Sequence, residues 1–253
     1  MMAQGDAASR GAMLLDRIEI VADEREERAL LDRLAKRDGP LTLAFANAHS
    51  FNLVWQSPEA CRAFMAADIL LRDGVGLQLH YRMAGKDAGL NMNGTDFIPK
   101  VLDACRGQKI ALFGTANPWL GRAAAALARS GHVVCAQREG FEGAEAYAAS
   151  LAREPAEVVV LAMGMPRQEA IAALIHQRFE HAPGPLVICG GAILDFLAER
   201  HPRAPLWVRK VRLEWLFRLS REPFRLFGRY VIGNARFLWR SRIVRRKSSE
   251  PQQ

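Results

Sequence analysis

Leu70-Leu71-Arg72-Asp73-Gly74-Val75-Gly76 has the pattern of a buried strand that turns tightly into a helix. Its apolar part ends abruptly in a carboxylate and two glycines. In open α/β sheets, ligands bind outside the carboxyl ends of the strands. Asp73 therefore lies where a reacting carboxylate can meet a ligand. On this stretch alone, an equally good interpretation is that Asp73 only caps the following helix.

Short apolar runs and helical patterns alternate on both sides of this stretch. Strands are expected at residues 41–46, 69–73, 109–113, 132–136, 157–163 and 185–189. Helices are expected at residues 23–37, 58–67, 75–84, 97–105, 118–129 and 144–152, with two more ending at Phe179 and Ala198. This order predicts an α/β fold, a Rossmann-like parallel sheet core with helices on both faces. We expect the core at residues 16–199, after a disordered N-terminus at residues 1–15.

A length of 253 residues allows one large domain, or one domain with an appendage. The four cysteines are widely spaced and form no CxxC motif, which indicates buried thiols in a reducing cytosol. The first residues lack the apolar centre of a signal peptide, and no apolar run is long enough to span a bilayer. Any membrane contact is therefore expected from one side.

Positive charge is concentrated near the C-terminus. Residues 200–247 hold fifteen Lys and Arg against two Glu, so this segment carries about +13 while the whole chain carries +8. Aromatic residues such as Trp215 and Trp239 are interleaved with the arginines. We expect helices at residues 205–220 and 223–244, with Arg225, Arg229, Arg236 and Arg240 in one stripe. Residues 200–246 are predicted to form a basic amphipathic appendage, followed by a tail at residues 247–253.

This appendage has two interpretations with different partners. Arginines and tryptophans together favour an anionic membrane surface, where rings enter the headgroup region and arginines meet phosphates. A non-enzymatic nucleic-acid-binding protein with a basic helical arm is the alternative.

Glycines at strand ends bear on nucleotide binding. Gly74-Val75-Gly76 lacks the third glycine of a dinucleotide fingerprint, and no Walker lysine motif occurs, which disfavours a nicotinamide or ATP enzyme. Gly114, Gly164 and Gly190 are compatible with a nucleotide diphosphate on helix N-termini, and equally with ordinary tight turns. The chain has no Asp-x-Asp motif and no histidine pair at ligand spacing, so no metal and no cofactor are expected.

Gly164-Met165-Pro166-Arg167-Gln168-Glu169 follows a strongly apolar strand and begins a helix. We expect Gln168 and Glu169 to project from the first turn, where the glutamine amide suits the edge of a uracil or a sugar. The helix dipole alone also explains a glutamate at this position.

Several short motifs, in order, carry a family resemblance over about residues 40–240. They are Asn47 after a strand, Asp73-Gly74-Val75, Gly94-Thr95-Asp96, Phe113-Gly114, Gly164-Met165-Pro166-Arg167-Gln168-Glu169, Gly190-Gly191 with Asp195-Phe196-Leu197-Ala198, Arg203-Ala204-Pro205, and Leu213-Glu214-Trp215-Leu216-Phe217-Arg218-Leu219 with Glu222-Pro223 and Arg229-Tyr230. In these motifs the chain resembles the bacterial WecG/TagA/CpsF glycosyltransferase family.

The resemblance implies an inverting, metal-independent hexosyltransferase that uses a UDP-sugar and an undecaprenyl-diphosphate-linked acceptor in surface or exopolysaccharide biosynthesis. It implies a peripheral protein at the cytoplasmic face of the inner membrane that can self-associate, with Asp73 as the catalytic base. The expected substrate-binding residues are Asn47, Asn93, Thr95, Asp96, Gly114, Gly164, Pro166, Gln168, Glu169, Gly190, Gly191 and Asp195. The expected lipid-diphosphate and membrane residues are Arg203, Arg212, Arg218, Arg225, Arg229 and Trp215. Many members have an arginine near the positions of Asn91 and Asn93, a difference that bears on which sugar is donated.

Overall fold

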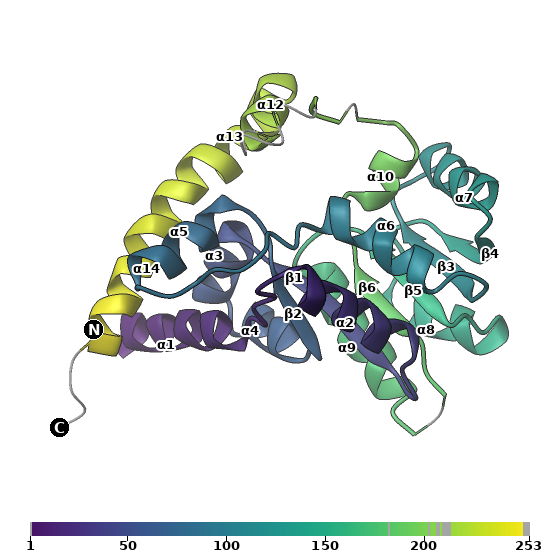
Figure 1. Ribbon diagram of the computed structural model, residues 1–253, viewed down its shortest axis with the longest axis horizontal. Helices are drawn as coiled ribbons and strands as arrows, with labels where there is room; N and C mark the ends of the chain where they lie inside the picture. The colour runs from purple at the N-terminus through teal and green to yellow at the C-terminus, as the bar shows by residue number, and fades with distance from the viewer. Residues whose placement is uncertain (1, 182, 202, 206–207, 209–213, 250–253) are drawn as a thin grey trace.

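The computed structural model describes residues 2–181, 183–201, 203–205, 208 and 214–249 (Figure 1). Its centre is a six-stranded parallel sheet in the order β2-β1-β6-β5-β3-β4. The strands are β1 (Leu41–Ala46), β2 (Ile69–Arg72), β3 (Lys109–Gly114), β4 (Val133–Arg138), β5 (Val158–Ala162) and β6 (Leu186–Cys189). The predicted α/β class and parallel sheet are confirmed.

Alternate residues of each strand enter two separate hydrophobic clusters, because successive side chains point to opposite faces. Ala44, Leu70 and Val159 belong to one cluster, and Leu43 and Leu71 to the other. The first face is covered by α1 (Met2–Arg17), α3 (Ala48–Gln56), α4 (Pro58–Met65), α5 (Val75–Met83), α8 (Ala144–Arg153) and α9 (Arg167–Arg178). The second is covered by α2 (Glu24–Ala35), α6 (Gly94–Ala104), α7 (Trp119–Arg129) and α10 (Ile193–Leu197).

The N-terminus corrects one sequence prediction. The disordered segment expected at residues 1–15 is wrong, because α1 is a helix that packs on α3 and α4. Leu14 is completely buried, and Gly11 lies against the rings of Phe51 and Trp55. Small residues such as Ala7 and Ala8 let α1 lie close to α3 and α4. They contribute little to a hydrophobic pattern, so the sequence does not predict this helix.

A second helix, α3, was also missed. Asn47 caps it by accepting hydrogen bonds from the backbone N–H groups of His49 and Ser50, and Ser50 completes a capping box. Phe51, Val54 and Trp55 are all buried, so α3 lacks the polar face that identifies a surface helix.

The C-terminal segment contains α12 (Glu214–Arg221), α13 (Pro223–Phe227), the π-helical turn η1 (Gly228–Ile232) and α14 (Gly233–Ser249). In Figure 1, α14 runs along α1, α3 and α5. Phe237 is completely buried and meets Phe51 edge-on with 5.1 Å between ring centroids. Arg240 stacks on Trp55 and donates to the side-chain oxygen of Asn52 at 2.8 Å. The last helix of the expected appendage thus shares the main core, whereas α12 buries none of its residues.

Within the described residues, no helix is both long enough and apolar enough to cross a bilayer.

Candidate active site

The carboxyl ends of the six parallel strands share one edge of the sheet, and most of the expected substrate residues lie along it. Asn47 follows β1, Asp73 follows the neighbouring β2, and Gly190 follows β6 on the other side of β1. This is the edge where open α/β sheets bind their ligands. The edge therefore defines the candidate site.

Asp73 lies at this edge beside Asn47. The Asn47 side-chain amide donates to a carboxylate oxygen of Asp73, with 3.4 Å between Nδ2 and Oδ2. The Asp73 backbone N–H extends the β1–β2 ladder by donating to Ala46 O at 2.7 Å. Gly74 occupies the cap position of α5, and no side chain bonds the cap there. The interpretation of Asp73 as a simple helix cap is therefore wrong, and its carboxylate is available for another purpose.

The surroundings of Asp73 raise the pKa of its carboxyl group above the usual value, and burial is the largest cause. The Asn47 amide and the charges of Arg229 and Arg218 act in the opposite direction, while Glu214 raises the pKa further. A carboxylate with a raised pKa is a stronger base than a free aspartate.

The Asp73-Gly74 turn is held by Arg72, a residue that sequence reasoning did not single out. Its side chain is only 1% exposed. The guanidinium donates to the carbonyl oxygens of Gly74, Ala88, Gly89 and Leu90 at 2.6–3.1 Å. Asn91 Oδ1 accepts from the Gly74 N–H at 2.8 Å. One buried cation therefore fixes both the turn after Asp73 and residues 88–91 against it, because its donors satisfy four carbonyls.

Two arginines of the C-terminal segment bring their charge to this corner of the site. The charge of Arg229 lowers the pKa of Asp73 and also that of His49. The pKa of His49 falls to about 4 through burial and this neighbouring charge. Arg218 acts on Asp73 and stacks on the ring of Phe196 in α10, with 5.4 Å to the centroid. Trp215 packs against Tyr230. Of the other expected lipid-contacting residues, Arg212 and the side chain of Arg225 lie outside the part that the structure describes.

A second group gathers where β3 and β5 end. The chain leaves β3 toward β4 and leaves β5 toward β6, so the connections diverge between these two strands. Gly114 lies so close to Ala162 that an added Cβ would be 2.3 Å from its carbonyl oxygen. Such divergence points are the preferred ligand crevices of doubly wound sheets.

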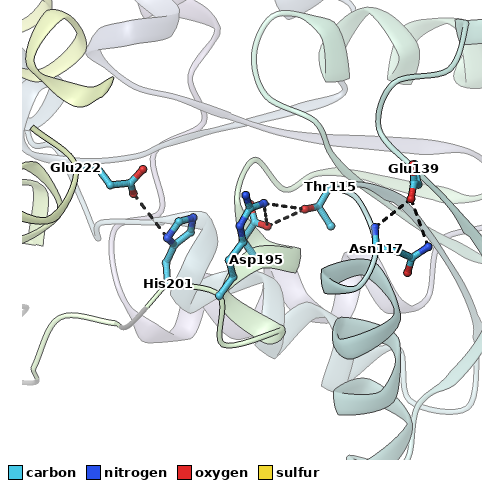
Figure 2. Close-up of polar contacts among 7 residues, drawn as sticks. Thr115, Asn117, Glu139, Asp195, His201 and Glu222 are labelled. Carbon is cyan, nitrogen blue, oxygen red and sulfur yellow. Dashed lines mark hydrogen bonds and ion pairs between the residues drawn. The ribbon is translucent and has the colours of Figure 1, made fainter. Parts of the chain in front are cut away.

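Polar side chains surround this divergence point (Figure 2). Thr115 donates from its hydroxyl to Asp195 at 2.8 Å, and Arg200 pairs with the same carboxylate at 3.1 Å. Next along the edge, Glu139 accepts from Asn117. Thr115 was missed in the sequence, although it directly follows the expected Gly114.

Gln168 and Glu169 are buried at the start of α9. Gln168 is fully buried, accepts from the Gly191 N–H at 2.9 Å and donates to Glu169 at 2.8 Å. Glu169 is 2% exposed, and burial raises its pKa to about 7. Both residues lie in the first turn of α9, as expected, but they are buried there, and their assignment to substrate binding stays a prediction. They lie beneath the Gly190-Gly191 turn and support it, with Gly164 and Pro166 at the turn that precedes α9.

The N-terminus of α6 forms a third group. Asn93 caps the helix and donates to Asp96 at 2.7 Å, and Thr95 is partly buried between them. Arg203 forms an ion pair with Asp96. A Cβ at Gly94 would lie 3.6 Å from the ring of Phe45, which places this helix start beside the end of β1. The three groups thus lie along the same edge of the sheet, where the strands have their carboxyl ends.

Within the described ranges, no three His, Cys, Asp or Glu side chains are grouped to hold a metal ion. The site offers a carboxylate of raised pKa, cations whose charge acts on it, and backbone amides at glycine turns. These parts suit proton abstraction beside an anionic leaving group.

The chain is similar in sequence to known proteins over most of its length. A family model described as "Glycosyl transferase WecG/TagA/CpsF family" matches residues 17–252. A similar protein of Bacillus spizizenii (strain ATCC 23059 / NRRL B-14472 / W23) is 24% identical over 175 residues, which cover 67% of each chain. That relative is named N-acetylglucosaminyldiphosphoundecaprenol N-acetyl-beta-D-mannosaminyltransferase.

Proposed function

Because the chain belongs to the WecG/TagA/CpsF family of glycosyltransferases, we propose that it moves a hexose-type sugar from UDP to a saccharide on undecaprenyl diphosphate. The candidate sugars are N-acetylmannosamine, its uronic acid, glucose and glucuronic acid, and the product enters a cell-surface polysaccharide or exopolysaccharide. The relative's name supports the lipid-linked acceptor and an N-acetylmannosamine donor. The observation that carries the proposal is the position of Asp73, at a strand end beside Asn47 and under the charges of Arg218 and Arg229.

In the proposed reaction, Asp73 takes the proton of an acceptor hydroxyl while that oxygen attacks the anomeric carbon of the donor. The bond from this carbon to the UDP oxygen breaks on the opposite face, so the configuration inverts and UDP leaves as the anion. The raised pKa of Asp73 favours this role, since a base works best when its pKa approaches the operating pH.

The leaving diphosphate needs positive partners, and the group at the ends of β3 and β5 supplies them. The backbone N–H groups of the turn at Gly164 and the guanidinium of Arg200 are suited to phosphate oxygens. We assign the nucleotide to this part of the edge and the acceptor to the corner with Asp73. The reaction is proposed to need no metal ion.

Arg218 and Arg229 are assigned to the diphosphate of the lipid acceptor. Both act electrostatically on Asp73, and arginine forks suit phosphate oxygens. Phe224 is fully exposed, Phe227 is about half exposed, and Leu216 and Ile232 are each more than 40% exposed in the same segment. Apolar side chains exposed next to arginines favour binding to the cytoplasmic face of the inner membrane over the nucleic-acid alternative.

The test is a screen of UDP-sugars with a lipid-diphosphate acceptor, with products identified by mass spectrometry. One UDP-sugar is expected to give an acceptor heavier by one hexose-type residue, with inverted linkage. Asp73→Asn should reduce turnover about 10²–10⁴-fold. The matched control is Asp103→Asn, because Asp103 is an exposed carboxylate on α6. Full activity of Asp73→Asn would remove Asp73 as the base, and no transfer from any UDP-sugar would remove the proposed donor class.

A further inference from the structure

A cavity of about 880 Å³ lies at the far end of α5 from the candidate site, between α1, α5 and the end of α14. The nine residues of α5 span about 13 Å, so this cavity is separate from the corner that contains Asp73. The family match and the proposed transfer reaction give it no role.

Four cations lie in the wall of the cavity, beside apolar side chains. Lys86, Arg242, Arg245 and Arg246 contribute to its wall, and Asp16 is the one carboxylate among the lining residues. Lys86, Arg242 and Arg246 are exposed, so their charges are accessible from solvent. A concave surface with several cations and one carboxylate attracts an anion.

A buried imidazole faces this cavity from α5. His80 lines the cavity, is 6% exposed, and its Nδ1 has no hydrogen-bond partner among the described residues. Burial and the charges of Arg245 and Lys86 lower its pKa to about 4, so the ring is neutral at pH 7 and adds no charge. A buried polar atom without a partner is uncommon, because leaving it unpaired costs free energy. A ligand oxygen carrying a proton, or a bound water, would supply that partner.

An exposed apolar stripe leads from the candidate site to the cavity. Val75, Leu79 and Met83 follow at intervals of four residues on α5, and each is 41–43% exposed. Val75 is two residues after Asp73, while Met83 also lines the cavity. Helix α5 packs beside α14 (Figure 1). The stripe therefore runs from the basic cavity to the Asp73-Gly74 turn.

We propose that this cavity binds the phosphate headgroup of an anionic glycerophospholipid, while Val75, Leu79 and Met83 contact its acyl chains. The ligand class follows from the juxtaposition: a soluble phosphate uses the cations alone, whereas a phospholipid uses the cations and the adjoining apolar stripe. Bound in this way, α5 lies on the bilayer surface with Asp73 at one end. The acceptor lipid then meets the base without leaving the membrane.

The first experiment compares two variants of equal charge change. Lys86→Gln/Arg242→Gln/Arg246→Gln removes three cations at the cavity. Arg129→Gln/Arg153→Gln/Arg178→Gln removes three exposed arginines, one each from the last turns of α7, α8 and α9. Both full-length variants are melted to verify folding, and their binding to vesicles of phosphatidylcholine with phosphatidylglycerol is measured by flotation.

The cavity variant is expected to bind these vesicles on the order of a hundredfold more weakly than the unmodified protein. The control variant should change only a few fold, since its positions are on other helices. Equal losses in the two variants would overturn the proposal, because binding would then follow net charge alone. Binding needs no donor sugar, so this result is independent of whether the proposed transfer reaction occurs.

The second experiment separates a headgroup site from a free-phosphate site. Calorimetry is performed with dihexanoylphosphatidylglycerol below its micelle concentration and, separately, with inorganic phosphate. Saturable binding of the short lipid, tighter than phosphate and weakened at least tenfold in Leu79→Gln/Met83→Gln, supports the proposal. Phosphate binding as tightly as the lipid, or no saturable lipid binding, would overturn it.

Discussion

The side-chain amide of Asn47 donates to the carboxylate of Asp73 across the ends of two adjacent parallel strands, at 3.4 Å. The carbonyl oxygen of the same amide caps α3 by accepting from the N–H groups of His49 and Ser50. Asn47 therefore fixes the direction in which α3 leaves the sheet and stabilises the charged form of the proposed base.

Asn47→Ser separates these two roles, because serine also caps helices but has no amide to donate. The amide lowers the pKa of Asp73, so its loss should raise that pKa. The acidic limb of the kcat/KM profile should then shift to higher pH, since the base must be ionised. Asn47→Ala, which also loses the cap, should additionally cost about 1 kcal/mol of stability. An unshifted limb in Asn47→Ser would show that the base is another group.

Asp73→Asn should not destabilise the protein. The pKa of Asp73 is raised in the folded state, so its protonated form favours folding. This contribution is present below the usual pKa of aspartate and is lost as the pH rises through the raised value. Above the raised pKa the ionised carboxylate opposes folding, and there the neutral amide is expected to melt at the same or a higher temperature. A clearly lower melting temperature would mean that the arginine charges outweigh burial.

The position of Asp73 and Asn47 could be predicted from the sequence because parallel strands place their carboxyl ends at one edge. The role of Arg72 could not. At the end of an apolar run it resembles the start of a polar turn, and its partners at residues 88–91 become visible only once that segment returns to β2.

Two further features could not be predicted from the sequence: the rotation of α9 about its axis and the packing of α1 through small residues. The Gly164 to Glu169 motif was correctly placed at the start of a helix, but its sequence does not specify how α9 is rotated against the Gly190-Gly191 turn. That rotation buries Gln168 and Glu169. In α1, alanines and Gly11 make the contacts that larger apolar residues make elsewhere, so the helical period was weak.

Glu169 should make the stability of the protein depend on pH. Burial raises its pKa from 4.5 to about 7, so the protonated form favours folding and its contribution is lost as the pH rises toward 7. The free energy of unfolding should fall by roughly 3 kcal/mol or less between these pH values. Urea unfolding of Glu169→Gln across the same range should lack this decline. An identical decline in the variant would assign it to other groups.

Phe237 and Trp239 offer a matched pair for testing how α14 is attached. Phe237 is completely buried against Phe51, whereas Trp239, two residues later, is 56% exposed. Phe237→Ala should lower the free energy of unfolding by about 3–5 kcal/mol, and Trp239→Ala by about 0.5 kcal/mol or less. Equal effects in denaturant unfolding would contradict the docking of α14 on the core. For the same reason, truncation before α14 is a poor test of membrane binding, because it also removes part of the core.

Transfer should persist when divalent cations are removed. In the proposed mechanism, the negative charge of departing UDP is balanced by glycine-turn amides and Arg200, and that of the acceptor diphosphate by Arg218 and Arg229. Excess EDTA should therefore leave the initial rate within about twofold, whereas Arg200→Gln should lower kcat/KM about 10²-fold through the loss of one charged donor. Arg122→Gln is the control. Arg122 and Arg200 both stack on the ring of Trp119, but only Arg200 pairs with Asp195 among the described residues. A rate abolished by EDTA and restored by Mg²⁺ would replace these cations with a metal ion as the partner of the diphosphate.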